Sequence, residues 1–117
     1  MQKNTVLPKN DDLDLVFKAL ADPTRRHFIE VLKQADATVG ELAEPLAMSL
    51  PAASKHISVL TSAGLVSKTK VGRVYRCHFQ PEAMLTANEW LEQNREAWND
   101  RLDALSDFLE SNTNEAT

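Results

Sequence analysis

The first third of the chain has the spacing of apolar residues that is typical of two amphipathic helices. Over residues 13–21 the apolar positions follow the i, i+3, i+4, i+7 pattern of one helix face. The pattern stops at Asp22 and Pro23, a favourable N-cap and a favourable first residue for a new helix. We therefore predict a second helix from Pro23 to about Lys33, preceded by a flexible N-terminal segment over residues 1–12.

The middle of the chain predicts two short helices joined by a tight turn. Thr38 and Glu41 have the spacing of a capping box, in which each side chain satisfies the backbone N–H of the other residue. Pro45 requires the first helix to be short or locally distorted, because proline cannot donate a helical hydrogen bond. Ser49 can cap the second helix, and Gly64 fits the position just past its end.

The last half of the chain predicts a hairpin and one long helix. Residues 65–79 form two β-prone runs on either side of Gly72. Residues 82–111 contain no proline or glycine and predict an amphipathic helix far longer than the usual ~11–12 residues. The expected fold is mostly α with a small β-hairpin (α+β). Its order α-α-α-α-β-β-α is that of a winged helix–turn–helix domain over residues 13–111, followed by a disordered tail at 112–117.

The charge distribution changes what the net charge of −4 would otherwise suggest. Residues 1–80 carry 11 Lys/Arg against 8 Asp/Glu, a net +3, whereas residues 81–117 carry 2 against 9, a net −7. Such asymmetry indicates a basic working face and an acidic segment held away from it. A solvated helix face explains the acidic part equally well.

Composition excludes several classes of protein. The single cysteine rules out an internal disulfide framework, and the sequence has neither a signal-peptide h-region nor an apolar run of the ~20 residues that span a membrane. We therefore expect a cytoplasmic protein. The histidines, His27, His56 and His78, fall on three different predicted elements, and no phosphate-binding glycine loop or nucleophile–base spacing is present. We expect no enzyme, no catalytic residue and no cofactor.

Three stretches of the sequence resemble the ArsR/SmtB family of bacterial winged-helix repressors. They are FKALADPTRRHFIEVL (17–32), VGELAEPLAMSLPAASKHISVLTSAGLV (39–66) and VGRVYR (71–76). With the tryptophan-containing terminal helix, the resemblance covers about residues 13–110. It implies a homodimer built from the first and last helices, with two recognition helices on a palindromic operator. It also implies that repression is relieved by an effector.

The sequence departs from the sites by which that family senses metals or sulfur chemistry. The cysteine pair that such sensors carry in the first helix of the helix–turn–helix is absent from the corresponding ELAEPLA. The terminal-helix zinc site uses Asp and His, and residues 82–111 contain no histidine. The family's redox sensors need two cysteines, and this chain has one. We therefore expect no metal site, and an effector that is an unknown small molecule or another non-metal signal.

Candidate contacts to double-stranded DNA lie on the second helix of the helix–turn–helix, on the hairpin and at one helix cap. Side chains near the start of a recognition helix face base edges, and basic hairpin residues reach phosphates or the minor groove. The candidates are Thr38, Ser49, Pro51, Ala52, Ser54, Lys55, His56, Ser58, Lys70, Arg73 and Arg76.

Structural interpretations of the same residues stay open. Thr38 could act purely as a cap, and His56 could be a partly buried histidine packed on the hairpin. Arg25 and Arg26 could contact DNA or form internal ion pairs with acidic residues. The basic hairpin could be an ordinary solvated strand face.

Candidate dimer contacts combine the resemblance with the pattern of the terminal helix. Trp90 and Trp98 are eight residues apart, which places them near one helix face. Packing on the chain's own core, or around an effector, would use the same face. The predicted interface is Leu13, Val16, Phe17, Trp90, Leu91, Trp98, Leu102, Leu105 and Leu109.

Two alternative functions follow from other features. The acidic terminal helix could make the chain a winged-helix protein–protein interaction module. Cys77 lies between Arg76 and His78, and neighbouring positive charge could lower its thiol pKa enough for thiol or redox sensing. The simpler interpretation of Cys77 is a small strand residue.

Overall fold

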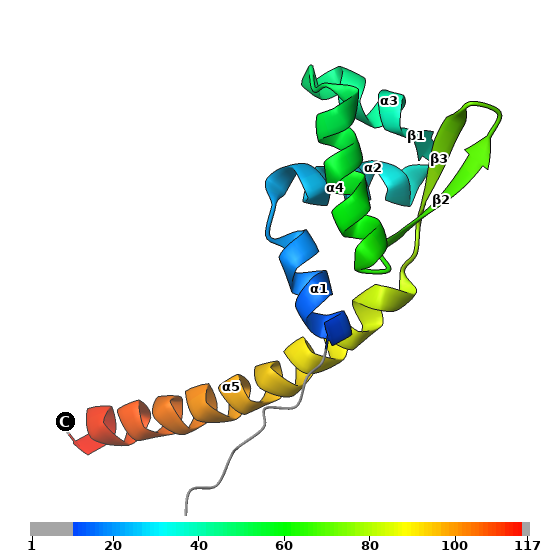
Figure 1. Cartoon of the computed structure of the whole chain (residues 1–117). Coiled ribbons are helices and arrows are strands. Elements are labelled where there is room, and N and C mark those ends of the chain that lie inside the picture. Colours follow the sequence, from blue (N-terminus) through cyan, green and yellow to red (C-terminus); the bar gives the residue numbers. More distant parts are fainter. Residues whose placement is uncertain (1–10, 116–117) are drawn as a thin grey trace, which may run out of the picture. The chain divides into compact units, whose positions relative to one another are not determined.

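The computed structural model describes residues 11–115 and has the element order of a winged helix–turn–helix domain (Figure 1). The predicted mostly helical fold with a small sheet is confirmed. Of the predicted flexible segment 1–12, residues 1–10 lie outside the described residues, and the last two begin the first helix. The elements are α1 (Asp11–Leu20), α2 (Pro23–Gln34), β1 (Ala37–Thr38), α3 (Val39–Ala43), η1 (Glu44–Leu46), α4 (Leu50–Ser62), β2 (Val66–Val71), β3 (Val74–Phe79) and α5 (Glu82–Glu115).

Side-chain caps fix where the helices begin, as the sequence predicts. The Asp22 carboxylate accepts from the backbone N–H groups of Thr24 and Arg25, at 2.8 and 3.1 Å, and Pro23 begins α2. Ser49 caps α4 by accepting from the N–H of Ala52 at 3.3 Å. These bonds satisfy N–H groups that have no partner within the helix, so the first turns of α2 and α4 are fixed.

The end of α4 is a Schellman motif. The N–H of Leu65 donates to the carbonyl of Leu60, and the N–H of Gly64 donates to the carbonyl of Thr61, both at 3.0 Å. Gly64 has a φ of +74°, which a residue with a side chain adopts only with strain. The motif turns the chain directly from α4 into β2.

The turn between the two helices of the helix–turn–helix follows from Pro45. The chain leaves α3 through the single 3₁₀ turn η1, in which Pro45 occupies an early position. Ala47 then adopts the left-handed conformation with a φ of +52°. The predicted short or distorted helix is thus a five-residue helix that tightens into η1 before the chain reverses.

The sheet has three antiparallel strands in the order β1-β3-β2, one more strand than the sequence predicted. In β1, Ala37 pairs with Cys77 and Thr38 pairs with Arg76. A strand of two residues is too short to show an alternating pattern in the sequence. Its place in the sheet is set by the long-range pairing with β3. The hairpin β2–β3 turns at Gly72, whose φ is +66°, and Val71 pairs with Val74.

The chain divides into two compact units, residues 1–87 and 88–117. In the first unit, α4 runs beside the hairpin with α3 at its N-terminal end (Figure 1). The core of this unit is apolar, and Phe28 from α2 and Ile57 from α4 are fully buried in it. No buried side-chain polar atom in the described part of the chain lacks a hydrogen-bond partner. The inward face of α4, Ala53, Ile57 and Leu60, holds this helix in place.

The second unit is the continuation of α5, which runs to Glu115, four residues beyond the predicted end at Ser111. Residues 112–115 are therefore helical where the sequence predicted a tail, and residues 116–117 lie outside the described part. No helix within residues 11–115 combines the length and the apolar character that crossing a bilayer requires.

Candidate nucleic-acid interface

A hollow of about 270 Å³ lies where the N-terminal ends of α3 and α4 meet the tip of the hairpin. Three residues predicted to contact DNA come together around it, although they belong to three separate parts of the sequence. These are Thr38 at the start of α3, Ser54 on α4 and Arg73 at the hairpin turn. The rest of the lining is Val39, Gly40, Leu50, Val74 and Tyr75. The hollow therefore has mostly apolar walls, with hydroxyl groups and one guanidinium among them.

The outward face of α4 carries most of the predicted recognition residues. Ser49, Pro51, Ser54, Lys55 and Ser58 are exposed. Ala52 is half-buried. Exposed hydroxyls can donate to or accept from base edges and phosphates, and the exposed ammonium of Lys55 can approach a phosphate.

His56, one of the predicted DNA contacts, is half-buried and packs on its own domain through one side of its ring. Its Nδ1 lies 3.2 Å from a terminal guanidinium nitrogen of Arg25, and its ring meets Phe28 edge-on at 6.2 Å between centroids. A guanidinium can only donate, so this bond requires Nδ1 to carry no proton. The predicted alternative of a partly buried histidine is closer to the structure, but its partner is α2 and not the hairpin.

Arg25 is the predicted internal ion-pair partner. Its guanidinium lies 3.9 Å from the Asp22 carboxylate and donates to the carbonyls of Lys18 and Ala19 at 3.0 and 2.8 Å. Burial opposes ionisation of Asp22, but the N–H groups of Arg25 and Thr24, with the charge of Arg25, outweigh it and lower the pKa of Asp22. Arg25 thus joins α1, α2 and α4 behind the recognition surface.

The hairpin separates its basic residues onto two faces. Lys70 pairs with Tyr75, and the Lys68 ammonium lies 5.0 Å from the centre of the Tyr75 ring, so these three residues share one face. Arg76 pairs with Thr69 and lies on the other face. Of the two predicted contacts Lys70 and Arg76, each therefore points to a different side of the hairpin.

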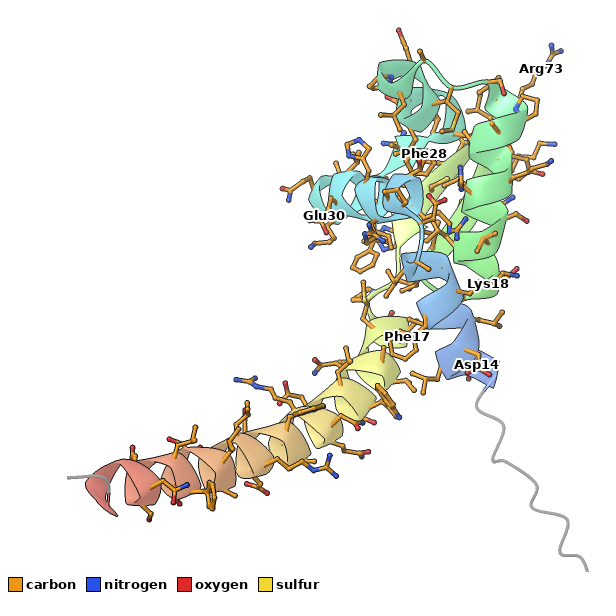
Figure 2. The ribbon with its side chains drawn as sticks, turned by 90° about the vertical axis from the view of Figure 1, so that its left-hand side faces the viewer. Asp14, Phe17, Lys18, Phe28, Glu30 and Arg73 are labelled. Carbon is orange, nitrogen blue, oxygen red and sulfur yellow. The ribbon has the colours of Figure 1, made fainter. Side chains whose placement is uncertain are left out.

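The tip of the hairpin presents Arg73 to solvent. Gly72 supplies the positive φ that the two-residue turn needs, and Arg73 follows it. Figure 2 shows the Arg73 side chain extending away from the domain at the end of α4 where the hollow lies. No ion pair within residues 11–115 involves this guanidinium, so its charge is available to a phosphate.

Thr38 forms the predicted capping box. Its hydroxyl accepts from the N–H of Glu41 at 3.1 Å, and its own N–H donates to a Glu41 carboxylate oxygen at 2.8 Å. The backbone and hydroxyl bonds of Thr38 hold the pKa of Glu41 below its usual range, with a smaller contribution from the charge of Arg76. Thr38 therefore caps α3 at the edge of the hollow.

Cys77 does not have the surroundings of a reactive thiol. It is fully buried at the centre of the sheet, and this burial raises the pKa of its thiol despite the nearby charge of Lys68. The sequence suggested the opposite shift because Arg76 and His78 flank it, but alternation turns both neighbours to the other face of β3. The structure corrects this alternative toward a small core residue.

The predicted dimer contacts fall into three groups by their exposure. Val16 is only 1% exposed and belongs to the core of its own domain, so it is removed from the predicted interface. Leu13 and Phe17 are half-buried beside that core. The α5 residues are all exposed in this chain: Trp90, Leu91, Trp98, Leu102, Leu105 and Leu109.

The apolar residues that line the hollow are not among the DNA contacts predicted from the sequence. Leu50 is three residues before Ala53 and seven before Ile57, so its helical phase predicts burial with them. In the structure Leu50 is 58% exposed, because it occupies the first residue of α4, where the helix begins at the edge of the core. Val74 and Tyr75 lie beside the hairpin turn, and the sequence pattern does not show that this end of the hairpin meets the start of α4.

Metal ligands are not gathered in the described part of the chain, where no group of three or more His, Cys, Asp or Glu side chains lies close enough to hold an ion.

The chain is similar to known regulators along most of its length. A helix-turn-helix domain family matches residues 20–69. The transcriptional repressor SdpR of Bacillus subtilis (strain 168) is 33% identical over 76 residues, which are 65% of this chain and 84% of SdpR. An ArsR-like transcriptional regulator from Rhodococcus sp. RHA1 superposes with a TM-score of 0.72 at 35% identity, covering 86% of this chain and 93% of that one.

A second similar structure is the homodimeric winged helix–turn–helix DNA-binding domain of Mb0332 from Mycobacterium bovis, a possible ArsR-family transcriptional regulator. It matches with a TM-score of 0.59 and 28% identity, over 74% of this chain and 82% of that one. Fold and similarity together define a helix–turn–helix DNA-binding transcriptional regulator, a class of protein that is not enzymatic. More particularly, the chain belongs to the ArsR family.

Proposed function

We propose that the protein is a homodimeric repressor that binds a palindromic operator and releases it in response to a signal other than a metal ion. The observation that carries the DNA site is the meeting of Thr38, Ser54 and Arg73 around one hollow at the start of α4. Hydroxyls on α4 face the base edges in this arrangement, while the Arg73 guanidinium contacts a phosphate or enters the adjacent minor groove. The exposed Lys55 and Lys70 add positive charge to the surface.

The apolar stripe of α5 supports the homodimer. Trp98, Leu102, Leu105 and Leu109 follow one another at steps of four, three and four residues, the spacing of a coiled-coil seam, and each is more than half exposed. If the stripe stays in water, the protein loses the stabilising free energy that burial of several large apolar side chains would contribute. A second copy of the same helix provides an equal stripe to cover it, and the similar Mb0332 domain is homodimeric.

The negative charge of α5 should make dimerisation depend on salt concentration. Residues 88–117 carry eight Asp/Glu and two Lys/Arg, so two copies brought together would repel each other electrostatically. Salt screens that repulsion and should strengthen the dimer. Salt should weaken DNA binding, because the release of cations from the phosphates, which favours binding, is less favourable at a higher salt concentration. The two steps of assembly on DNA therefore respond to salt in opposite directions.

Repression and its release rest on the relatives and on the chain's own residues. SdpR is a transcriptional repressor, and it aligns with this chain over 84% of its own length. The proposal of a non-metal signal follows from the terminal helix, whose residues 82–111 include no histidine, and from a single cysteine that is buried.

The dimer is tested by sedimentation equilibrium of Leu105→Asp beside Ser106→Asp. Both variants add one negative charge to neighbouring exposed positions of α5, but only the first places it on the apolar stripe. We expect Leu105→Asp to sediment as a monomer and Ser106→Asp to remain dimeric. A Leu105→Asp protein that is still dimeric would contradict the proposed seam.

The operator is tested by selection from random duplex DNA with the full-length protein, followed by gel shift on the enriched sequence. We expect an inverted repeat whose half-site centres lie about one helical turn (10–10.5 bp) or a multiple apart. Failure to enrich any sequence, or enrichment of a single asymmetric site, would contradict the proposed palindrome.

A further inference from the structure

Three exposed apolar side chains line a hollow in a surface that the proposed function places against DNA. Leu50, Val74 and Tyr75 are 58, 51 and 46% exposed, and they belong to α4 and to the hairpin strand beside it. Val39 completes the apolar part of the lining. Removing this apolar cluster from water is favourable, so the hollow favours an occupant that presents an apolar group to it.

Base edges in the major groove offer one apolar group, the C5-methyl of thymine. The first residues of a recognition helix are those that reach base edges, and Leu50 is the first residue of α4. Residues 50–62 contain no Arg, Asn or Gln, and Lys55, the one residue there of a type that makes bidentate contacts to guanine, lies outside the lining of the hollow. Sequence preference at this point therefore has to come from shape and apolar contact.

We propose that Leu50 is a specificity-determining residue that reads the methyl group of a thymine seated in this hollow. The proposal deepens the DNA-binding function and rests on it. The Leu50 side chain packs against the methyl group from the α4 side, with Val74 and the Tyr75 ring facing it from the hairpin. Ser54, one turn along α4, is left to hydrogen-bond with the neighbouring base or phosphate.

The position of Leu50 is fixed by its neighbours. Ser49 caps the helix and Pro51 restricts the first turn, so the backbone at Leu50 has little freedom. On the α3 side, a Cβ added to Gly40 would lie 3.8 Å from Leu50 Cδ2, so the absence of a side chain at Gly40 keeps the hollow open next to Leu50. A preorganised apolar contact of this kind discriminates by shape.

The test replaces thymine with deoxyuridine, one position at a time, in the operator obtained by selection. Deoxyuridine has the same hydrogen-bonding edge and lacks only the methyl group. At one position of each half-site we expect affinity to fall by about fourfold, the effect of one buried methyl group, and by roughly the square of that when both half-sites are changed.

The assignment to Leu50 comes from the same titrations with Leu50→Ala. This variant should bind thymine and deoxyuridine operators equally, whereas Leu46→Ala, another exposed leucine outside the hollow, should keep the wild-type preference. Circular dichroism checks that both variants fold, and Leu50→Met should restore part of the preference because it returns an apolar side chain of similar length.

The outcomes separate this proposal from the DNA-binding function. A protein that binds its operator tightly but shows no loss with deoxyuridine at any position retains the proposed function and overturns the thymine site. A loss that persists unchanged in Leu50→Ala overturns the role of Leu50. A protein that enriches no DNA sequence overturns the proposed function itself.

Discussion

The guanidinium of Arg25 contacts Nδ1 of His56 at 3.2 Å, and this contact ties the start of α2 to the middle of the recognition helix. The same guanidinium donates to the last carbonyls of α1, which have no partner within that helix. Two half-buried residues that the sequence offered as candidates for DNA contact thus contact each other. Their contact links α4 to α1 and α2.

Arg25→Ala should therefore lower the free energy of unfolding by on the order of 2–3 kcal/mol, because hydrogen bonds to a charged group contribute ~1.5–3 kcal/mol. Urea denaturation followed by circular dichroism measures this. Arg26→Ala is the matched control: its exposed side chain makes one bond, to the Leu20 carbonyl, and its loss should cost less than ~1 kcal/mol. Equal losses from the two variants would show that Arg25 has no special structural role.

Asp22→Asn should make stability less dependent on pH. The Asp22 pKa is lowered in the folded protein, so its charge stabilises the fold at neutral pH, and this contribution disappears as pH falls through the folded pKa. Because asparagine caps a helix as well as aspartate does, the substitution isolates the charge. The two proteins should differ by about 0.5–1 kcal/mol at pH 7, given the partial exposure of the pair, and the difference should shrink as pH falls from the ordinary aspartate pKa of ~3.9 through the lower folded pKa. A constant difference from pH 7 to pH 3 would contradict this assignment.

Cys77 should be inert in the folded protein. Burial raises its thiol pKa and blocks access, so a disulfide reagent should react far more slowly with the native protein than with the protein unfolded in guanidinium chloride. Operator affinity should be the same before and after mild peroxide treatment, and Cys77→Ala should retain it. A change in affinity on oxidation that Cys77→Ala abolishes would restore the thiol-sensing alternative.

Gly40→Ala should separate stability from DNA binding. The new Cβ makes ordinary contacts, 3.8 Å to Leu50 and 3.9 Å to Thr38, so the helix-favouring residue should stabilise the fold by about 0.5–1 kcal/mol. The same methyl group narrows the hollow and should weaken operator binding.

Gly64→Ala is the control with the opposite expected effects, because the φ of +74° at Gly64 makes any side chain there strained. It should lose stability while the folded protein keeps its affinity. A Gly40→Ala protein with unchanged affinity would show that DNA does not enter the hollow.

Much of the fold was predictable because its signals are local. Asp22, Thr38, Ser49 and Gly64 each act within a few residues of their own position, and the structure places all four as their sequence context predicts. The features that were missed depend on contacts across the chain. The strand β1 exists only through its pairing with β3.

In the candidate site too, features with local signals were predictable and features that depend on contacts across the chain were not. Arg73 could be placed at the hairpin tip because Gly72 defines the turn. His56 could not be assigned, because whether a helix position faces DNA or Arg25 depends on where α2 crosses α4. Leu50 has the helical phase of a core residue. It lies outside the core only because α4 begins, at Leu50, past the edge of the core.

The most direct test of the proposed DNA interface is the salt dependence of operator binding, measured by fluorescence anisotropy for wild type, Arg73→Ala and Lys33→Ala. Lys33→Ala is the control, because it removes the same charge from a residue that is paired with Glu30 on α2. Log Kobs should fall linearly with log salt concentration, and Arg73→Ala should lower the slope by about one per subunit and weaken binding across sequences. Lys33→Ala should match wild type. Identical slopes for all three proteins, or binding that does not respond to salt, would contradict the proposed DNA interface.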